Sequence, residues 1–339
     1  MWVHNNPRTK PLQITTMTTK NDTPEKTRLH IRNKNREAYD LEALKKAVPE
    51  LEQHIKPNKY GAESVDFAKP EAVKLLNQAL LSHYYGIKNW NFPDENLCPP
   101  IPGRADYLHY IADLLTQTDF GNLPEGNKIT ALDIGVGANC IYPIIGFTEY
   151  GWNFIGSDID PKSVETAKKI VESNESLAGK IEIKLQENSD AFFDGIIGEN
   201  DKVDLTFCNP PFHSSSEEAE KGTQRKLKNL TGKTPQKNTL NFAGISNELI
   251  YEGGEAAFIH KMIRESKQFA ENVFWFSTLV SKQGNLKGIY KLLNEMEIVQ
   301  IKTIQMGTGN KSTRIIAWSY LPKAKQQEWR EQRWISKNK

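Results

Sequence analysis

Cysteine is scarce in this chain of 339 residues, and its three cysteines, Cys98, Cys140 and Cys208, form no CxxC pair. This spacing excludes a disulfide framework and a zinc site built on paired cysteines, so we expect no metal. No apolar run approaches the ~18–20 residues of a membrane-spanning helix, and mean hydropathy is −0.60. No apolar signal segment opens the chain. We therefore expect a cytoplasmic protein with reduced thiols, no membrane association and no obligate protein partner.

Net charge is also small, because 44 Lys and Arg stand against 42 Asp and Glu. This balance excludes a globally basic coat protein for nucleic acids. Two acid-free runs stand out: residues 26–36 carry five Lys and Arg, and residues 221–237 carry six. Such runs are usually solvated faces, but two of them in a nearly neutral chain favour a localised nucleic-acid contact. We expect the phosphate contacts to come from Arg32, Lys34, Arg36, Arg225, Lys226 and Lys228.

Composition and periodicity divide the chain into four parts. The polar leader shows no helical or strand period, and whether Met1 or Met17 is the start stays open. Apolar residues at helical spacing follow, and then a linker at 121–126. The predicted parts are a disordered leader at 1–25, a helical module at 26–125, an α/β domain at 126–321 and a charged tail, expected to be peripheral, at 322–339.

The pattern of the α/β domain is an alternation of short apolar runs with helices. This alternation predicts a doubly wound, mostly parallel seven-stranded sheet with helices on both faces. The last two strands are joined by a short glycine-containing turn, so we expect them to pair antiparallel. The predicted strands are residues 129–134, 152–157, 181–185, 203–208, 273–280, 298–305 and 314–320.

Two strand ends carry residues typical of a nucleotide-like ligand site. The first ends in Asp133-Ile-Gly135-Val-Gly137, where glycines allow a sharp turn and close approach of a ligand. A plain glycine turn is the alternative, and neither a phosphate-binding P-loop nor the dinucleotide GxGxxG matches. After the next strand, Asp158 can bind the two hydroxyls of a ribose, whereas Asp160 is expected to cap the following helix.

The fourth strand ends in Asn209-Pro210-Pro211-Phe212. A proline-stiffened turn is the structural alternative, but the residues suit one chemistry well. An exocyclic amine conjugated to a ring is a poor nucleophile, and the Asn209 amide oxygen and the Pro210 carbonyl can each accept one of its N–H groups. Phe212 offers a face on which a flipped base can stack, and the two prolines hold the acceptors in fixed directions.

The combination of Asp-x-Gly-x-Gly with Asn-Pro-Pro-Phe resembles the class I S-adenosylmethionine-dependent amino-methyltransferases, which have a Rossmann-like fold. The wider matches (DIGVGANCIYPIIG, GSDID, CNPPFHSS, RKLKNL, NELIYEGGEAAFIHKMI and WFSTLVSK) resemble the bacterial 23S ribosomal RNA adenine-N6 methyltransferase family. That family is related to the eukaryotic enzyme that modifies U6 small nuclear RNA. The resemblance spans residues 29–320, nearly the whole chain.

The resemblance implies a role for each matched position. Asp133, Gly135 and Gly137 would line the methionine and ribose side of S-adenosylmethionine, and Arg104 would reach its carboxylate. One residue of the segment 186–190 would border its adenine, and the sequence does not single it out. The sulfonium already makes the methyl group electrophilic, so no metal, general base or covalent nucleophile is expected.

We therefore predict methyl transfer from S-adenosylmethionine to N6 of one adenine in 23S ribosomal RNA, either free or in a large-subunit assembly intermediate. The module at 26–125 would then recognise RNA or act as a lid over the cofactor. Protein glutamine N5-methylation is the main alternative, because those enzymes share Asn-Pro-Pro. DNA adenine methylation and RNA binding without catalysis are weaker alternatives, since the sequence shows no groove-reading domain and keeps every motif intact.

Overall fold

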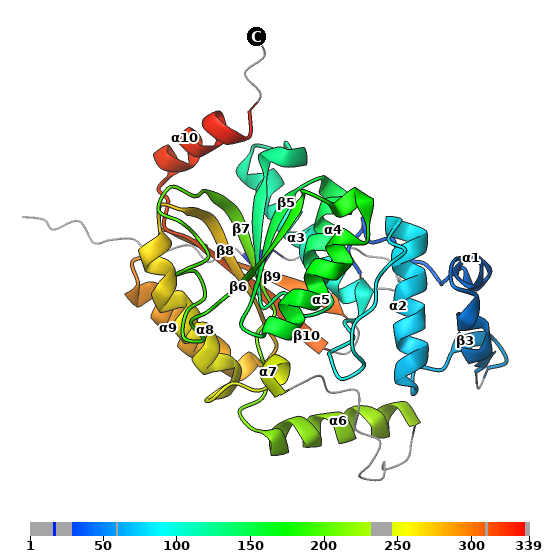
Figure 1. Cartoon of the computed structure of the whole chain (residues 1–339). Coiled ribbons are helices and arrows are strands. Elements are labelled where there is room, and N and C mark those ends of the chain that lie inside the picture. The colour runs from blue at the N-terminus through cyan, green and yellow to red at the C-terminus, as the bar shows by residue number, and fades with distance from the viewer. Residues whose placement is uncertain (1–15, 18–28, 59, 232–245, 309–310, 336–339) are drawn as a thin grey trace, which may run out of the picture.

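The computed structural model describes residues 16–17, 29–58, 60–231, 246–308 and 311–335. Its centre is a twisted sheet with helices on both faces (Figure 1). A smaller group of helices from the N-terminal part of the chain lies beside this sheet (Figure 1). No helix in these ranges is both long and apolar enough to cross a membrane.

The sheet contains all seven predicted strands, and their order in space is β9-β10-β8-β7-β4-β5-β6. β10 pairs antiparallel with both β8 and β9, and the other pairs among the seven are parallel. The predicted mostly parallel sheet with an antiparallel last pair is therefore confirmed. The strands are β4 (Thr130–Ile134), β5 (Asn153–Asp158), β6 (Ile181–Leu185), β7 (Val203–Cys208), β8 (Val273–Val280), β9 (Gln300–Thr308) and β10 (Lys311–Ser319).

An eighth strand was not predicted. Thr16 and Met17, within the leader that we expected to be disordered, form β1 (Thr16–Met17) and pair parallel with Thr303 and Ile304 of β9. The expectation of a wholly irregular leader is wrong at these two residues, because the exposed edge of β9 offers backbone groups that can pair with another strand. The remainder of residues 1–25 lies outside the described part of the chain.

Helices cover the sheet in two layers, and the strands alternate between two hydrophobic cores. Along β10, Ile315 and Ala317 belong to one core, whereas Ile316 and Trp318 belong to the other. This alternation follows from the two-residue period of a strand. The first core is covered by α3 (Ile101–Thr118), α4 (Ile141–Tyr150) and α5 (Pro161–Glu172), and the second by α8 (Gly254–Ser266) and α9 (Leu286–Glu295).

The predicted N-terminal module is continuous with the first core. Its helices α1 (Leu41–Ala47) and α2 (Pro70–Tyr85) stand beside a small hairpin of β2 (Ile55–Pro57) and β3 (Glu63–Val65). Its last helix, α3, covers the sheet directly, since the Tyr107 hydroxyl lies 2.8 Å from Ser277 Oγ of β8. Although α3 lies in the predicted N-terminal module, it packs on the sheet as one of the helices of the α/β fold.

The segment after Pro322 is not the peripheral tail that we expected. It forms α10 (Lys323–Arg333), and its end packs on Asp204 of β7, whose side chain is fully buried. The indole nitrogens of Trp329 and Trp334 donate to Asp204 Oδ1 at 2.6 and 2.7 Å, and Arg333 Nη2 donates to Oδ2 at 2.8 Å. The amide of Thr130 also donates to Oδ2, at 2.7 Å. Buried charge and aromatic packing therefore hold this segment at the amino end of the parallel strands.

The second acid-free run, at residues 221–237, begins inside a helix that we did not predict from the sequence. α6 spans Ser216–Thr231, beneath the carboxyl edge of the sheet, and α7 spans Ser246–Leu249 (Figure 1). The missed signal was a capping motif: Ser215 Oγ accepts from the amide of Glu218, and Glu218 Oε2 accepts from the amide of Ser214 at 2.8 Å. Outside the described part of the structure lie the side chains of Arg225, Lys226 and Lys228 and all of residues 232–245.

Candidate active site

The carboxyl ends of β4, β5 and β7 meet at one cavity, as the sequence predicts. The turn after β4 needs glycine at two positions, because Gly135 and Gly137 have φ of +72° and +63°. The amides of Gly135 and Val136 both donate to the carbonyl of Ser157 on β5, at 2.9 Å. A Cβ on Gly137 would lie 3.7 Å from Glu248 Oε1, so the turn also comes close to α7.

The two aspartates at the end of β5 have different surroundings, and the predicted capping role of Asp160 is confirmed. Asp160 caps α5: its Oδ2 accepts from the amide of Ser163 at 2.9 Å and from Ser163 Oγ at 2.7 Å. Asp158 lines the cavity, and its two oxygens accept from the amides of Gly137 and Asp160, both at 2.9 Å. Burial raises the pKa of Asp158 against the lowering effect of these two hydrogen bonds. Lone pairs on the same carboxylate remain for a ribose.

Asp133 is the next-to-last residue of β4 and comes just before the glycine turn. Its side chain is 1% exposed, and neither oxygen has a hydrogen-bond partner within the described ranges. Burial raises the pKa of Asp133 well above the ordinary range, with Arg104 lowering it and Asp158 raising it further. A buried carboxylate without partners is costly for the fold, so it points to a group that arrives from outside.

Arg104, from the first turn of α3, lines the same cavity. Its Nη1 donates to the Tyr142 hydroxyl at 2.8 Å, and the guanidinium carbon lies 5.5 Å from the centre of the Tyr142 ring. Burial raises the pKa of Tyr142 to about 12, so this hydroxyl stays a neutral partner at physiological pH. The buried Arg104 Nε has no partner in the described structure. The arginine is therefore oriented by Tyr142 while part of its fork stays available to an anion.

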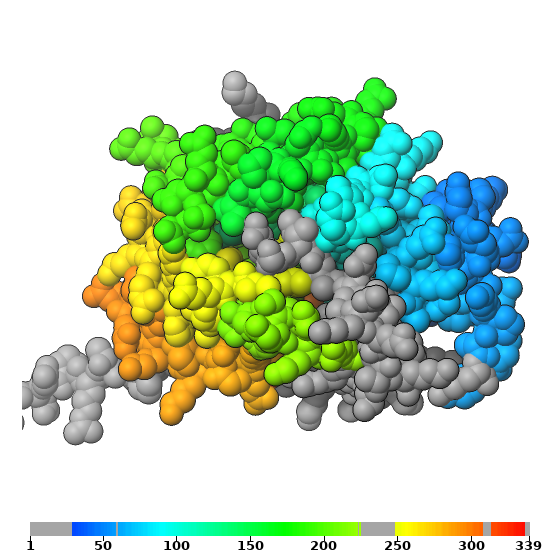
Figure 2. Space-filling view, turned by 60° about the horizontal axis from the view of Figure 1, so that its bottom comes forward, coloured from blue at the N-terminus to red at the C-terminus, as the bar shows by residue number. Residues whose placement is uncertain are grey.

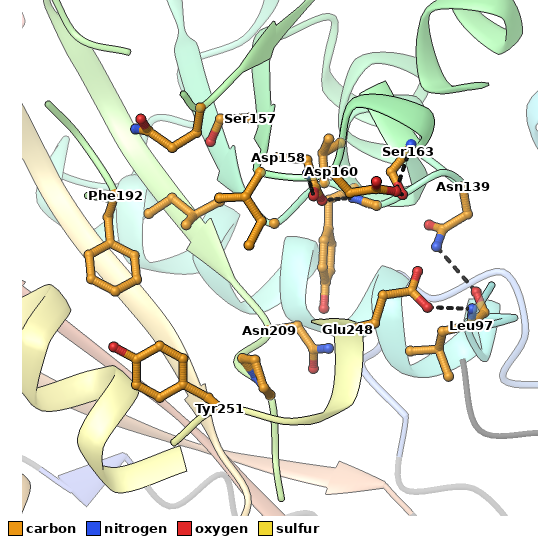
Figure 3. A pocket seen from close by; sticks show the side chains of 18 of the residues that line it. Leu97, Asn139, Ser157, Asp158, Asp160, Ser163, Phe192, Asn209, Glu248 and Tyr251 are labelled. Carbon is orange, nitrogen blue, oxygen red and sulfur yellow. Dashed lines mark hydrogen bonds between the residues drawn. The ribbon is translucent and has the colours of Figure 1, made fainter. Parts of the chain in front are cut away.

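Asn209 follows β7 and directs its amide toward the cavity (Figure 3). Its Oδ1 is buried and accepts no hydrogen bond from the residues that the structure describes. Pro211 lines the cavity beside it, whereas Pro210 and Phe212 are not among the lining residues. The chain turns away after Pro211, because His213 pairs with the 249–251 segment through its amide and its carbonyl, at 3.0 Å each.

An aromatic wall that the sequence did not single out closes another side of the cavity. Phe258 makes edge-on contacts with Phe192 at 4.8 Å and with Tyr251 at 5.1 Å between ring centres, and all three line the cavity. Glu265 fixes the loop that carries Phe192 by accepting from three successive backbone amides at 2.8–3.0 Å. Three aromatics spaced over 67 residues leave no periodic signal, so only the fold brings them together.

The segment 186–190, where one adenine contact was expected, contributes Gln186 and Ser189 to the lining. Gln186 is occupied within its own loop, since its Nε2 donates to the carbonyl of Asp194 at 2.8 Å and its Oε1 accepts from Asn188 at 2.9 Å. Asp190 pairs with Lys261. Ser189 is therefore the member of this segment that lines the cavity without these loop contacts.

None of the described residues of the first basic run lines the cavity. Arg32 makes an ion pair with Asp113 at 2.8 Å, and Lys34 makes one with Glu149 at 2.9 Å. Arg36 in the same segment also has a partner. Glu149 is near the C-terminal end of α4, whereas the cavity is at its N-terminal end, and ten helical residues span about 15 Å. The structure thus gives Arg32 and Lys34 a structural role and does not bring them to the site.

Comparison with known proteins agrees with this geometry. A family model described as "RNA methyltransferase" matches residues 23–322. The "Ribosomal RNA large subunit methyltransferase F" of Cytophaga hutchinsonii is 55% identical over 91% of this chain and 96% of its own. The protein of the same name from Photobacterium profundum is 50% identical over 94% and 99%.

Solved structures give the same result for the fold. The catalytic domain of human METTL16 in complex with MAT2A 3′UTR hairpin 1 aligns with a TM-score of 0.73 and 28% identity, covering 86% of this chain and 96% of that one. The N-terminal domain of human METTL16 in complex with SAH aligns with a TM-score of 0.68 and 27% identity, covering 87% and 99%. With a family model over most of its length and relatives at half identity or more, the chain belongs to the RNA methyltransferase family.

Proposed function

We propose that this protein transfers a methyl group from S-adenosylmethionine to N6 of one adenine in 23S ribosomal RNA. The observation that carries the proposal is the buried Asn209 Oδ1, an unused acceptor at the end of β7 that faces the same cavity as the glycine turn and Asp158. The names of the bacterial relatives support large-subunit ribosomal RNA as the substrate. Because ribosomal RNA of bacteria is made in the cytoplasm, we expect the enzyme to act there.

The unsatisfied groups of the cavity suit this cofactor. Arg104 and Asp158 line the cavity, where the first offers a partly free guanidinium to a carboxylate and the second offers acceptors to a ribose. Asp133 is not itself a lining residue, but its two buried carboxyl oxygens lack partners among the described residues and could accept from a bound molecule. SAH, which is bound in the related human domain, is what this cofactor becomes once its methyl group is lost. When bound, the cofactor supplies an electrophilic methyl group on a positively charged sulfur.

The chain itself has to orient the amine and keep water away. Asn209 Oδ1 can accept one N–H of the adenine amine, and the Pro210 carbonyl is the second acceptor that the motif provides. Two acceptors favour a pyramidal nitrogen, whose lone pair is no longer conjugated with the ring and can attack the methyl group. Pro211 and Tyr251, which line the cavity with Asn209, bound the apolar space for the base. Stacking on Phe212 remains a prediction of the motif.

The path of the RNA strand follows from where the base must enter. Figure 2 shows one face of the molecule, with the N-terminal part in blue and cyan, residues of the α/β domain in green, α6 in yellow-green and the part of the chain that contains α8 in yellow. α6 leaves directly from the Asn209 motif, and positions 221, 225 and 228 fall on one face of this helix. We propose that Arg225, Lys226 and Lys228 contact phosphates near the target nucleotide.

The test is methyl transfer in vitro with radiolabelled S-adenosylmethionine. Large-subunit RNA stripped of protein, from cells lacking this gene, should acquire N6-methyladenosine at one position, identified by nucleoside analysis and mapping. Asn209→Ala should abolish labelling but keep cofactor binding. Label in a protein fraction, as methylglutamine, would contradict the RNA assignment and favour the glutamine alternative.

We propose further that the substrate is free RNA or an assembly intermediate. The cavity holds its acceptor in a buried position, so the adenine has to leave its stack to reach it. A finished subunit restricts that movement more than free RNA does. Comparing free RNA, partly assembled particles and complete subunits as substrates tests this point, and equal labelling of complete subunits would contradict it.

A further inference from the structure

Glu248 connects two parts of the chain across the cavity. It belongs to α7, and its Oε2 accepts from the backbone amide of Leu97 at 2.9 Å (Figure 3). Its Oε1 accepts from Asn96 Nδ2 at 3.3 Å. Both Glu248 and Leu97 line the cavity. The Glu248 carboxylate thus connects the side of the cavity formed by α7 with the side formed by Asn96 and Leu97 of the N-terminal part.

The second backbone group of Leu97 is held as well. Its carbonyl accepts from Asn139 Nδ2 at 3.3 Å, and Asn139 follows the glycine turn (Figure 3). On the opposite side of the segment, Asn77 of α2 donates to Cys98 Sγ at 3.1 Å and to the carbonyl of Pro99 at 2.8 Å. Leu97 is therefore the point where the N-terminal part, the glycine turn and α7 are tied together.

The contacts toward the cavity differ in strength. The bond from Asn139 is long for a neutral amide donor, whereas the bond to Glu248 has ordinary length and a carboxylate acceptor. Without Glu248, the backbone of Leu97 would keep only the weaker of its two hydrogen bonds on the cavity side, the one from Asn139. Such a change alters the cavity wall and leaves the residues of the glycine turn, Asp158 and Asn209 in the sequence, although Glu248 lies close to Gly137.

We propose that Glu248 is a positioning residue for S-adenosylmethionine, acting through the Asn96–Leu97 segment. By fixing Leu97, it holds in place one wall of the cavity that the glycine turn and Arg104 also line. The inference rests on the proposed function for the identity of the ligand. We expect loss of Glu248 to lower cofactor affinity more than the rate of methyl transfer, because Glu248 acts by holding the cavity wall at Leu97.

The experiment measures the dissociation constant of S-adenosylmethionine by calorimetry, without RNA, for the full chain and five variants. Glu248→Ala should weaken binding by about tenfold or more, as expected for loss of hydrogen bonds to a charged acceptor. Glu248→Gln keeps an acceptor for the Leu97 amide and should stay within about threefold of the unaltered protein. Glu252→Ala, four residues further along and exposed, is the matched control and should bind normally.

A double-mutant cycle tests whether the segment carries the effect. Asn96→Ala should weaken binding less than Glu248→Ala. The double variant should lose less affinity than the sum of the two single effects, because both changes loosen the same segment, and full additivity would contradict this shared route. Thermal unfolding of each variant confirms folding, and kcat at saturating cofactor should fall less than the affinity does.

Three outcomes would overturn a specific claim. Normal binding by Glu248→Ala would refute the positioning role. Binding by Glu248→Gln as weak as by Glu248→Ala would also refute it, because it would show that negative charge acts on the cofactor directly. Absence of S-adenosylmethionine binding by the unaltered protein would instead refute the proposed function, so the two failures are distinguishable.

Discussion

Replacement of Asp133 by Asn should stabilise the ligand-free protein and weaken cofactor binding. Both carboxylate oxygens are buried and lack hydrogen-bond partners in the described structure. A buried polar group without a hydrogen-bond partner destabilises the fold by about 1–3 kcal/mol. The asparagine amide would also lack partners, so the substitution removes only part of this destabilisation. We therefore expect a gain of about 1–2 kcal/mol at neutral pH, or roughly 1–3 °C in Tm for a chain of this length.

The stability difference between Asp133→Asn and the unaltered protein should depend on pH in a definite direction. Burial raises the pKa of Asp133 well above its ordinary value of 3.8, so the folded protein binds this proton more tightly than the unfolded chain does. Stability from this group is therefore full below the ordinary value and is lost as pH rises through the folded pKa. The advantage of Asp133→Asn over the unaltered protein should accordingly grow from acid to neutral pH.

Urea unfolding at several pH values, without ligand, measures this difference. Asp160→Asn is the matched control, because hydrogen bonds from Ser163 lower the pKa of Asp160 and its stabilisation is lost as pH falls. In calorimetry, Asp133→Asn should weaken S-adenosylmethionine binding by about 10–100-fold, or about 1.4–2.7 kcal/mol. If the variant is less stable than the unaltered protein at neutral pH, or if the difference does not change with pH, the assignment of Asp133 as an uncompensated charge is wrong.

Three other changes have expected outcomes of different kinds. Asp204→Ala should lower the free energy of unfolding by about 3–5 kcal/mol in urea titrations, because it leaves Arg333 and two indoles without their buried acceptor; an effect under about 1 kcal/mol would contradict this. Asn209→Asp should reduce kcat by about 10²–10³-fold while calorimetry shows unchanged cofactor affinity. Arg104→Lys, which loses the planar fork and the bond to Tyr142, should weaken cofactor binding by about tenfold in the same assay.

The sheet could be predicted from the sequence because each strand is a short buried run with a polar or glycine-rich end. The same ends gave the glycine turn, Asp158 and Asn209, since parallel strands bring their carboxyl ends to one edge. α6 was missed because its basic composition suggested a solvated loop, although Ser215 and Glu218 form a capping motif. α10 was missed for a similar reason: its charged residues conceal Trp329 and Trp334, which are buried.

The rest of the site could not be predicted because it depends on contacts between distant segments. Glu248 reaches Leu97 across 151 residues, and nothing near either residue marks the pair. Arg32 and Lys34 were assigned to RNA from a charge run, yet their partners Asp113 and Glu149 are far away in sequence. A local charge pattern does not show whether the opposite charges arrive from elsewhere in the fold.

Two buried aspartates on neighbouring strands show how the structure itself marks a site. Asp133 on β4 and Asp204 on β7 are 1% and 0% exposed, and their strands pair in parallel. Asp204, near the amino end, accepts from two indoles, an arginine and a backbone amide, whereas Asp133, near the carboxyl end, has no partner among the described residues. Burial alone therefore does not distinguish them. Asp204 stabilises the fold at one end of the sheet, whereas the carboxyl group of Asp133 at the other end has no such partners, and the cofactor site that we propose there would explain why it is kept.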